Sequence, residues 1–184
     1  RLSSGKKIID PSDDAAGLAV ASRMSAQISR IDAARSNLSN SVSFLQTQDG
    51  FLQKVGKALD RMSELSVLAQ DITKSDGDRA LYAEEFTQLK TMVSDSAGMT
   101  FNGVKMFGSQ SKAVTVNEDG GTTKLPAINL QADPYAAAVA DETAIVTLDS
   151  AAAALATVKE GMSQVSTDRA KVGSAQASLE AESE

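Results

Sequence analysis

Pairs of acidic residues are the side chains that could do chemistry in this chain. They occur at Asp13–Asp14, Asp76–Asp78, Glu84–Glu85 and Asp141–Glu142. Such groupings can bind a divalent cation or exchange a proton with a substrate. Asp76–Asp78 resembles the start of a calcium loop, but the alternating ligands and the closing Glu of a twelve-residue loop are not assembled there. We interpret this segment as a turn between helices and predict no metal site.

The composition leaves little material for an active site. The chain contains no His and no Cys, which removes the commonest general base, the thiol nucleophile and the usual ligands of transition metals. Aromatic residues make up only 4% of the sequence and Trp is absent, so an aromatic-lined ligand pocket is not favoured. Gly120-Gly121 lacks the Gly-Lys-Ser/Thr sequence of a phosphate loop. We therefore predict no catalytic residue, no cofactor and no enzymatic activity.

The net charge of -6 argues against two classes of partner. Nucleic acids and anionic membranes bind clustered Lys and Arg, and we expect neither to be a partner of this acidic chain. No apolar run approaches the ~20 residues that span a bilayer. The sequence starts at Arg1, which is not a natural initiator, and this leads us to expect a fragment of a longer protein.

Large apolar residues repeat every seven positions near both ends of the chain. A strict repeat of this kind is typical of helices that pack as a coiled coil, because one narrow seam then faces a partner over many turns. The same inner side of the first helix also carries Met62 and Leu65. The predicted seam consists of Met24, Ile31, Leu38, Leu45, Leu52 and Leu59 in the first ladder, with Val158, Val165, Val172 and Leu179 in the second.

The order of patterns predicts a mainly α fold, an elongated antiparallel helical bundle of about three helices with a small β-hairpin. A helix over residues 13–71 would be roughly 85 Å long, whereas a compact globule of this size would be about 40 Å across. We therefore expect a single rod-shaped domain over residues 1–184. Its expected parts are a lead-in at 1–12, the long helix at 13–71, a return helix at 79–97, the hairpin at 113–130 and a final helix at 149–184.

The other side of the long helix is rich in polar residues that carry no charge. A solvated helix face usually favours Glu and Lys, whereas uncharged polar groups are easier to desolvate. Two interpretations stay open at this point, a contact surface between subunits and an ordinary wet face. The residues are Ser22, Gln27, Ser36, Asn37, Ser39, Asn40, Ser43, Gln46, Gln48 and Gln53.

Four segments together resemble the flagellin family, the subunits of bacterial flagellar filaments. They are Arg1–Gly5, Asp13–Ala19, Phe101–Lys105 and Arg169–Gly173. The departures are few: Lys6, Lys7 and Ile9 before the acidic pair, and Ala177 and Ser178 in place of Asn-Arg in the last helix. The resemblance implies the coiled-coil domain of a secreted, extracellular structural protein that self-assembles into the flagellum for motility. It also implies polymerising segments outside this chain, so we expect the chain alone to form no filaments.

The resemblance also implies partners. These are other flagellin subunits, a secretion chaperone, the filament cap and a Toll-like receptor of animal hosts. The positions that match known receptor contacts are Arg61, Leu65 and Glu85, although Asp60 departs from the Gln often found beside that Arg. Two alternative functions fit the same helices: a protein joining hook to filament, and a flagellin homologue that acts as a cell-surface adhesin or carbohydrate receptor.

Overall fold

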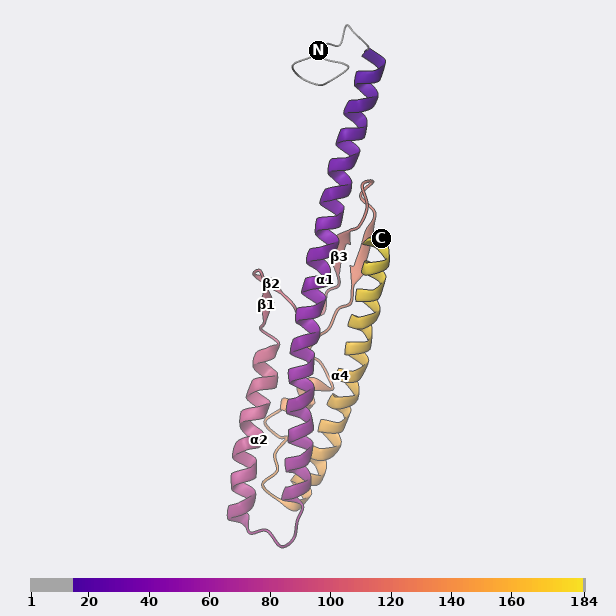
Figure 1. Ribbon diagram of the computed structural model, residues 1–184. Coiled ribbons are helices and arrows are strands. Elements are labelled where there is room, and N and C mark those ends of the chain that lie inside the picture. The colour runs from indigo at the N-terminus through magenta and orange to yellow at the C-terminus, as the bar shows by residue number, and fades with distance from the viewer. Residues whose placement is uncertain (1–14, 184) are drawn as a thin grey trace.

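The chain folds into a rod built around one long helix. The computed structural model describes residues 15–183, so the predicted lead-in at 1–12 and the pair Asp13–Asp14 lie outside the described residues. Helix α1 spans Ala15–Ala69, and its 55 residues make it about 82 Å long. Gly50 and Gly56 do not interrupt it. Figure 1 shows the other elements packed along one part of α1, while its first turns extend beyond them.

Helix α2 (Asp76–Ser96) folds back along α1 and starts earlier than the predicted residue 79. The reason is a capping box at Ser75. The Ser75 hydroxyl accepts a hydrogen bond from the Asp78 backbone N–H (3.2 Å), and the Asp78 carboxylate accepts one from the Ser75 N–H (2.9 Å). Asp76 and Asp78 therefore belong to the first turn of the helix, where carboxylates also complement the helix dipole.

Two antiparallel strand pairs follow, of which the sequence predicted one. Strands β3 (Lys112–Thr115) and β4 (Thr122–Leu125) form the predicted hairpin, and β4 ends immediately before Pro126. The short pair β1 (Thr100–Phe101) and β2 (Val104–Lys105) was not predicted. Its turn is Asn102-Gly103, with φ of 49° and 78°, which is the backbone that Asn-Gly favours between hairpin strands.

The segment between the hairpin and the last helix contains a short helix, α3 (Tyr135–Val139), that the sequence did not predict. Lys90 of α2 holds this segment in place, since its ammonium group donates hydrogen bonds to the carbonyls of Ala140 and Thr143. Burial lowers the pKa of Lys90, while nearby Asp141 and Glu142 act in the opposite direction.

Helix α4 (Leu148–Ser183) runs antiparallel to α1 and makes the most extensive contact with it. The fold is therefore mainly α, with three long helices in an elongated bundle and small strand pairs, as predicted. The last residues of α4, Glu182 and Ser183, lie beside Ile31 and Arg35 of α1. Residues 15–30, here called the overhang, extend past this point for about 24 Å.

Candidate functional site

The contact between α1 and α4 is the seam that the two apolar ladders predict. Eight of the predicted residues are buried there, and Ile31 is half-buried. Met24 does not belong to the seam, because its side chain is 60% exposed. It lies in the overhang, where no second helix within residues 15–183 faces it. The buried eight are Leu38, Leu45, Leu52, Leu59, Val158, Val165, Val172 and Leu179.

Glycines bring α1 and α4 close together in the middle of the seam. Gly161 of α4 is buried, and a Cβ atom there would lie 3.4 Å from Leu59 Cδ1. A Cβ atom on Gly56 of α1 would lie 3.4 Å from Val165 Cγ1. Both distances are ordinary contact distances, so each glycine leaves just enough room for the opposite side chain.

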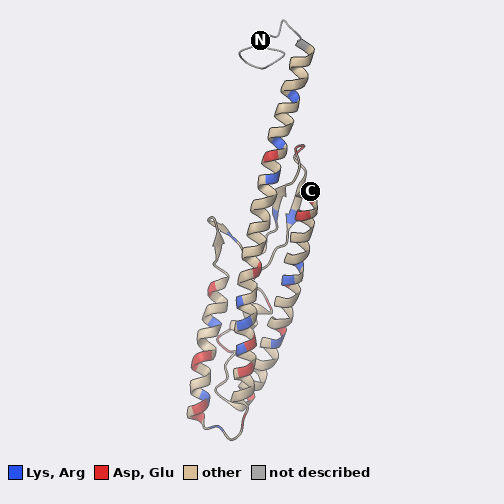
Figure 2. Cartoon of the chain, in the orientation of Figure 1, with Lys and Arg blue, Asp and Glu red and all other residues tan. Residues whose placement is uncertain are grey.

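Helix α1 presents a long uncharged face outside the seam. Residues 36–48 of α1 contain no charged side chain, and Figure 2 shows this part of α1 almost free of blue and red. Several hydroxyls on this face donate to their own helix, such as Ser43 Oγ to the Ser39 carbonyl (3.0 Å) and Thr47 Oγ1 to the Ser43 carbonyl (2.9 Å). Their donors are already satisfied, which lowers the cost of covering them. The exposed members are Ser22, Gln27, Ser36, Asn37, Ser39, Asn40, Ser43, Gln46 and Gln53.

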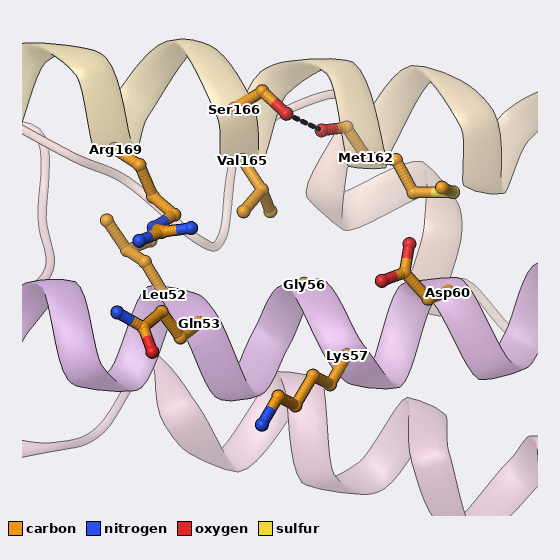
Figure 3. Close-up of a pocket in the computed structure, with 9 residues that line it drawn as sticks. All are labelled: Leu52, Gln53, Gly56, Lys57, Asp60, Met162, Val165, Ser166 and Arg169. Atoms are coloured by element: carbon orange, nitrogen blue, oxygen red, sulfur yellow. Dashed lines mark hydrogen bonds between the residues drawn. The ribbon is translucent and has the colours of Figure 1, made fainter.

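A groove of about 440 Å³ runs along the seam beside Gly56. Figure 3 shows Arg169 of α4 reaching toward α1, with Val165 pointing into the gap above Gly56. The Arg169 guanidinium donates to both carboxylate oxygens of Asp49 (2.8 and 3.2 Å), and this pair lowers the pKa of Asp49. The Ser166 hydroxyl donates to the Met162 carbonyl of its own helix (3.1 Å). The Asp49–Arg169 ion pair thus joins the two helices beside the groove.

The acidic groupings are separated from one another in the structure. Asp76 and Asp78 cap α2, Glu85 pairs with Arg61, and Asp141 and Glu142 are exposed. Within residues 15–183, no three acidic side chains come together in a way that could hold a metal ion. In the same range, no helix is long and apolar enough to cross a bilayer.

Sequence reasoning missed buried polar side chains along the seam, of which Gln48 and Asp168 bond to other elements. Gln48 was assigned to the uncharged outer face, but it is buried and its Nε2 donates to the Met106 carbonyl (2.6 Å). Asp168 of α4 is also buried and accepts a hydrogen bond from the Tyr135 hydroxyl (2.9 Å). Both fall three residues after one seam position and four before the next, and this spacing was the signal that could have identified them.

The Asp168 carboxylate is the centre of a small buried network. Besides Tyr135, it accepts hydrogen bonds from Gln164 Nε2 (3.0 Å) and Lys171 Nζ (2.9 Å). Burial, with the adjacent carboxylate, raises the pKa of the Tyr135 hydroxyl well above its usual value. The phenol therefore stays protonated and acts as a donor that fixes α3 against α4.

The residues that resemble receptor contacts lie where α1 and α2 meet. Arg61 donates to both oxygens of Glu85 (2.7 and 3.0 Å) and to Glu64 (2.6 Å), and its hydrogen bonds to Glu85 lower the pKa of that carboxyl. Leu65 is 0% exposed, so the prediction that it contacts a receptor is wrong for this structure. It packs inside because it lies on the apolar side of α1. The receptor contact remains a prediction for Arg61 and Glu85.

Comparison with known sequences places these features in a family. The model of the bacterial flagellin N-terminal helical region matches residues 1–112. The 30.7 kDa flagellar filament core protein of Treponema maltophilum is 32% identical over 96% of this chain and 67% of its own length. Flagellin of Listeria monocytogenes is 40% identical over 58% of this chain, which spans 38% of that protein.

Solved structures share the fold. Bacillus cereus flagellin matches with a TM-score of 0.72 and 22% identity, over 81% of this chain and 87% of that one. A putative flagellar hook-associated protein from Vibrio parahaemolyticus matches with a TM-score of 0.72 and 16% identity, over 95% and 92%. At these identities the likeness concerns the fold alone. The matched helical region and the Treponema relative identify the chain as a member of the bacterial flagellin family.

Proposed function

We propose that this chain serves as a structural subunit of a bacterial flagellar filament, that it is secreted, and that it does no chemistry. The observation that carries this proposal is membership of the flagellin family, whose members include proteins named for the filament core. A rod with a narrow, well-packed seam suits such a role. It keeps a fixed shape while leaving most of its length free for neighbours.

The uncharged face of α1 is the surface through which we expect subunits to meet. A face without Lys or Glu can be covered at little cost, because no charge has to leave water. The internally bonded hydroxyls of Ser43 and Thr47 lower that cost further. Contacts of this kind are weak singly and become strong when repeated along a filament.

We also propose further partners from the family resemblance. We expect a secretion chaperone before export, a filament cap during growth, and contact of the Arg61–Glu85 pair with a host Toll-like receptor. Because Arg61 is already bound to Glu85 and Glu64, a receptor has to approach a cluster with one excess negative charge and not a free cation. Arg61→Ala should reduce receptor signalling in reporter cells, and an unchanged response would count against the contact.

Two alternatives use the same fold. A hook–filament junction protein is supported by the fold shared with the Vibrio hook-associated protein. A surface adhesin or carbohydrate receptor is less favoured, since sugars stack on exposed aromatic rings. Here Phe44, Phe86, Phe107 and Tyr135 are buried and Phe51, Tyr82 and Phe101 are half-buried, so no aromatic side chain among the described residues is fully exposed.

Immunogold electron microscopy on the bacterium that makes this protein separates the three functions. Antibodies raised against the chain should label filaments along their whole length. Label confined to the boundary between hook and filament would favour the junction protein, and label on the cell body would favour the adhesin. Cells lacking the gene are the control for antibody specificity.

A further inference from the structure

The turn between β1 and β2 presents an Asn-Gly pair to solvent. Asn102 and Gly103 are both exposed, and Figure 1 shows the strand pair projecting from the end of α2 to one side of the bundle. Both backbones are left-handed, with φ of 49° and 78°, a conformation that Asn and Gly tolerate better than other residues. When Gly follows Asn, its backbone nitrogen can approach the side-chain amide closely, because Gly has no side chain to obstruct it.

The two groups that would react are free in this turn. Within residues 15–183, neither the Asn102 side chain nor the Gly103 N–H makes a hydrogen bond. A Cβ atom built on Gly103 would meet nothing within 4 Å, so the surroundings of the turn are open. The amide carbon of Asn102 is therefore accessible, and no partner holds the nitrogen that would attack it.

The attack requires the Asn102 backbone to rotate out of the turn, and little holds the turn closed. Strands β1 and β2 pair through only two residues each, and so short a pair is marginally stable in water. The base of the pair is anchored more firmly. Phe101 packs edge-on against Phe44, with ring centroids 5.8 Å apart, and the Met106 carbonyl accepts the hydrogen bond from Gln48. The turn can therefore open while its base stays in place.

Three of the other four asparagines of the chain are held in helices or by local hydrogen bonds. Asn37 and Asn40 lie inside α1, where the helix engages the backbone nitrogen of the following residue. Asn129 Oδ1 accepts a hydrogen bond from the Gln131 N–H (3.0 Å). In each of these three cases, the next residue also carries a side chain that obstructs the approach of its nitrogen.

Asn117 is the most informative comparison, because it too lies in a hairpin turn. Its Oδ1 accepts hydrogen bonds from the N–H groups of Asp119 (3.2 Å) and Gly121 (2.7 Å), which hold the side-chain amide in one orientation. The next residue is Glu118, which is much larger than Gly. Asn117 therefore lacks both of the features that leave Asn102 open to attack.

We infer that Asn102 is a site of spontaneous deamidation. The Gly103 nitrogen attacks Asn102 Cγ and forms an N–C bond, while the bond from Cγ to Nδ2 breaks. The proton of the attacking nitrogen leaves with the NH₂ group as ammonia, and a succinimide ring remains. Water then opens the ring by adding to one of its two carbonyl carbons. Addition at Cγ gives aspartate, and addition at the backbone carbon gives isoaspartate, so no oxidant or reductant is consumed.

The reaction changes the turn and leaves the bundle intact. Either product places a carboxylate where a neutral amide stood, and isoaspartate also adds a methylene group to the backbone of the turn. The pairing of Phe101 with Val104 is then out of register, whereas the contacts at the base persist. Since the reaction needs only water, the modified fraction increases with the age of the chain. The inference concerns the chain's own chemistry and does not depend on the proposed function.

Peptide mapping by mass spectrometry tests the site on the folded chain after incubation in mildly alkaline buffer. Cleavage after lysine releases residues 91–105, in which Asn102 is the only side-chain amide, and residues 113–124, in which Asn117 is the only one. The second peptide is thus a matched internal control. Protein isoaspartate methyltransferase with a labelled methyl donor detects isoaspartate. Asn102→Ser removes the amide at an exposed position and is the control variant.

The 91–105 peptide should gain the mass that exchange of an amide for a carboxyl produces, and isoaspartate should appear in the same peptide. The 113–124 peptide should stay unchanged in the folded chain, and Asn102→Ser should remove the isoaspartate signal. In urea, where the hydrogen bonds of Asn117 are lost, the 113–124 peptide should begin to react.

Three results would overturn the inference. The first is a 91–105 peptide that reacts in urea but stays unmodified in the folded chain, which would mean that the closed turn protects Asn102. The second is equal rates for the two peptides of the folded chain. The third is aspartate without isoaspartate, which would indicate direct hydrolysis of the amide and no succinimide. None of these results bears on where gold label lies on the bacterium.

Discussion

The two parts of α1 carry the same seven-residue apolar repeat but have opposite environments. In the covered part, residues 34–69, the repeat lies against α2 and α4 and its leucines are buried. In the overhang, Met24 continues the repeat but is exposed, as is the nearby apolar residue Ile28. The difference teaches that the period of a helix identifies a face, whereas packing against a partner helix decides whether that face becomes core.

The largest expected effect separates the two parts directly. Leu52→Ala removes a buried side chain of the seam and should lower the free energy of unfolding by about 2–5 kcal/mol. Met24→Ala should change it by less than about 0.5 kcal/mol, since the side chain is mostly in water already. Urea denaturation followed by circular dichroism measures both. Equal losses would mean that the overhang is as well packed as the seam.

A second test concerns the buried network of the covered part. Asp168→Ala removes the acceptor of the Tyr135 hydroxyl and should cost about 1–3 kcal/mol of stability, because a buried donor is left unsatisfied. Adding Tyr135→Phe removes that donor and should recover part of the loss. The same denaturation series decides this, and a double variant less stable than Asp168→Ala alone would contradict the account.

Glycines provide a smaller effect of opposite sign. Gly50 lies inside α1, and a Cβ atom there would meet nothing within 4 Å, so Gly50→Ala should stabilise the protein by about 0.5–1 kcal/mol. Gly56→Ala is the matched comparison, and it should gain less because its Cβ would touch Val165. Thermal unfolding of the two variants measures both gains in stability. A larger gain for Gly56→Ala than for Gly50→Ala would contradict this expectation.

The smallest expected effect is the pH dependence of the Asp49–Arg169 pair. The pair with Arg169 lowers the pKa of Asp49 in the folded protein below that of an ordinary Asp. The pair therefore stabilises the fold fully when the pH is above the ordinary pKa, and this stabilisation is lost as the pH falls through the folded pKa. A partly exposed pair of this kind contributes at most about 1 kcal/mol. Asp49→Asn and Arg169→Gln should each lose less stability than the unchanged chain on acidification. Parallel pH curves for all three would show that the pair contributes nothing.

Much of the fold could be predicted from local patterns. The seven-residue period predicted the long helices, and Gly120-Gly121 between alternating residues predicted the β3–β4 hairpin. The helix α3 carries no periodic signal of its own and depends on tertiary contacts from Lys90 and Asp168. The burial of Gln48 also depends on a distant partner, the Met106 carbonyl, which no local pattern reveals.

Leu65 shows a conflict between two kinds of inference. Its position on the inner side of α1 indicated burial, whereas the family resemblance indicated a receptor contact. The structure buries it, so the physical pattern gave the better prediction at this residue. Arg61 and Glu85, which lie between the two helices and are partly exposed, are the ones that both inferences leave available.

Hydrogen exchange along α1 in dilute solution tests the central claim most directly. Backbone amides of the covered part should exchange at the rate of global unfolding, since their helix is held by the seam. Amides of the overhang should exchange orders of magnitude faster, because an isolated helix of its length is marginal in water. Equal protection along the whole of α1 would contradict the claim that the helix is packed as core in one part and exposed to solvent in the other.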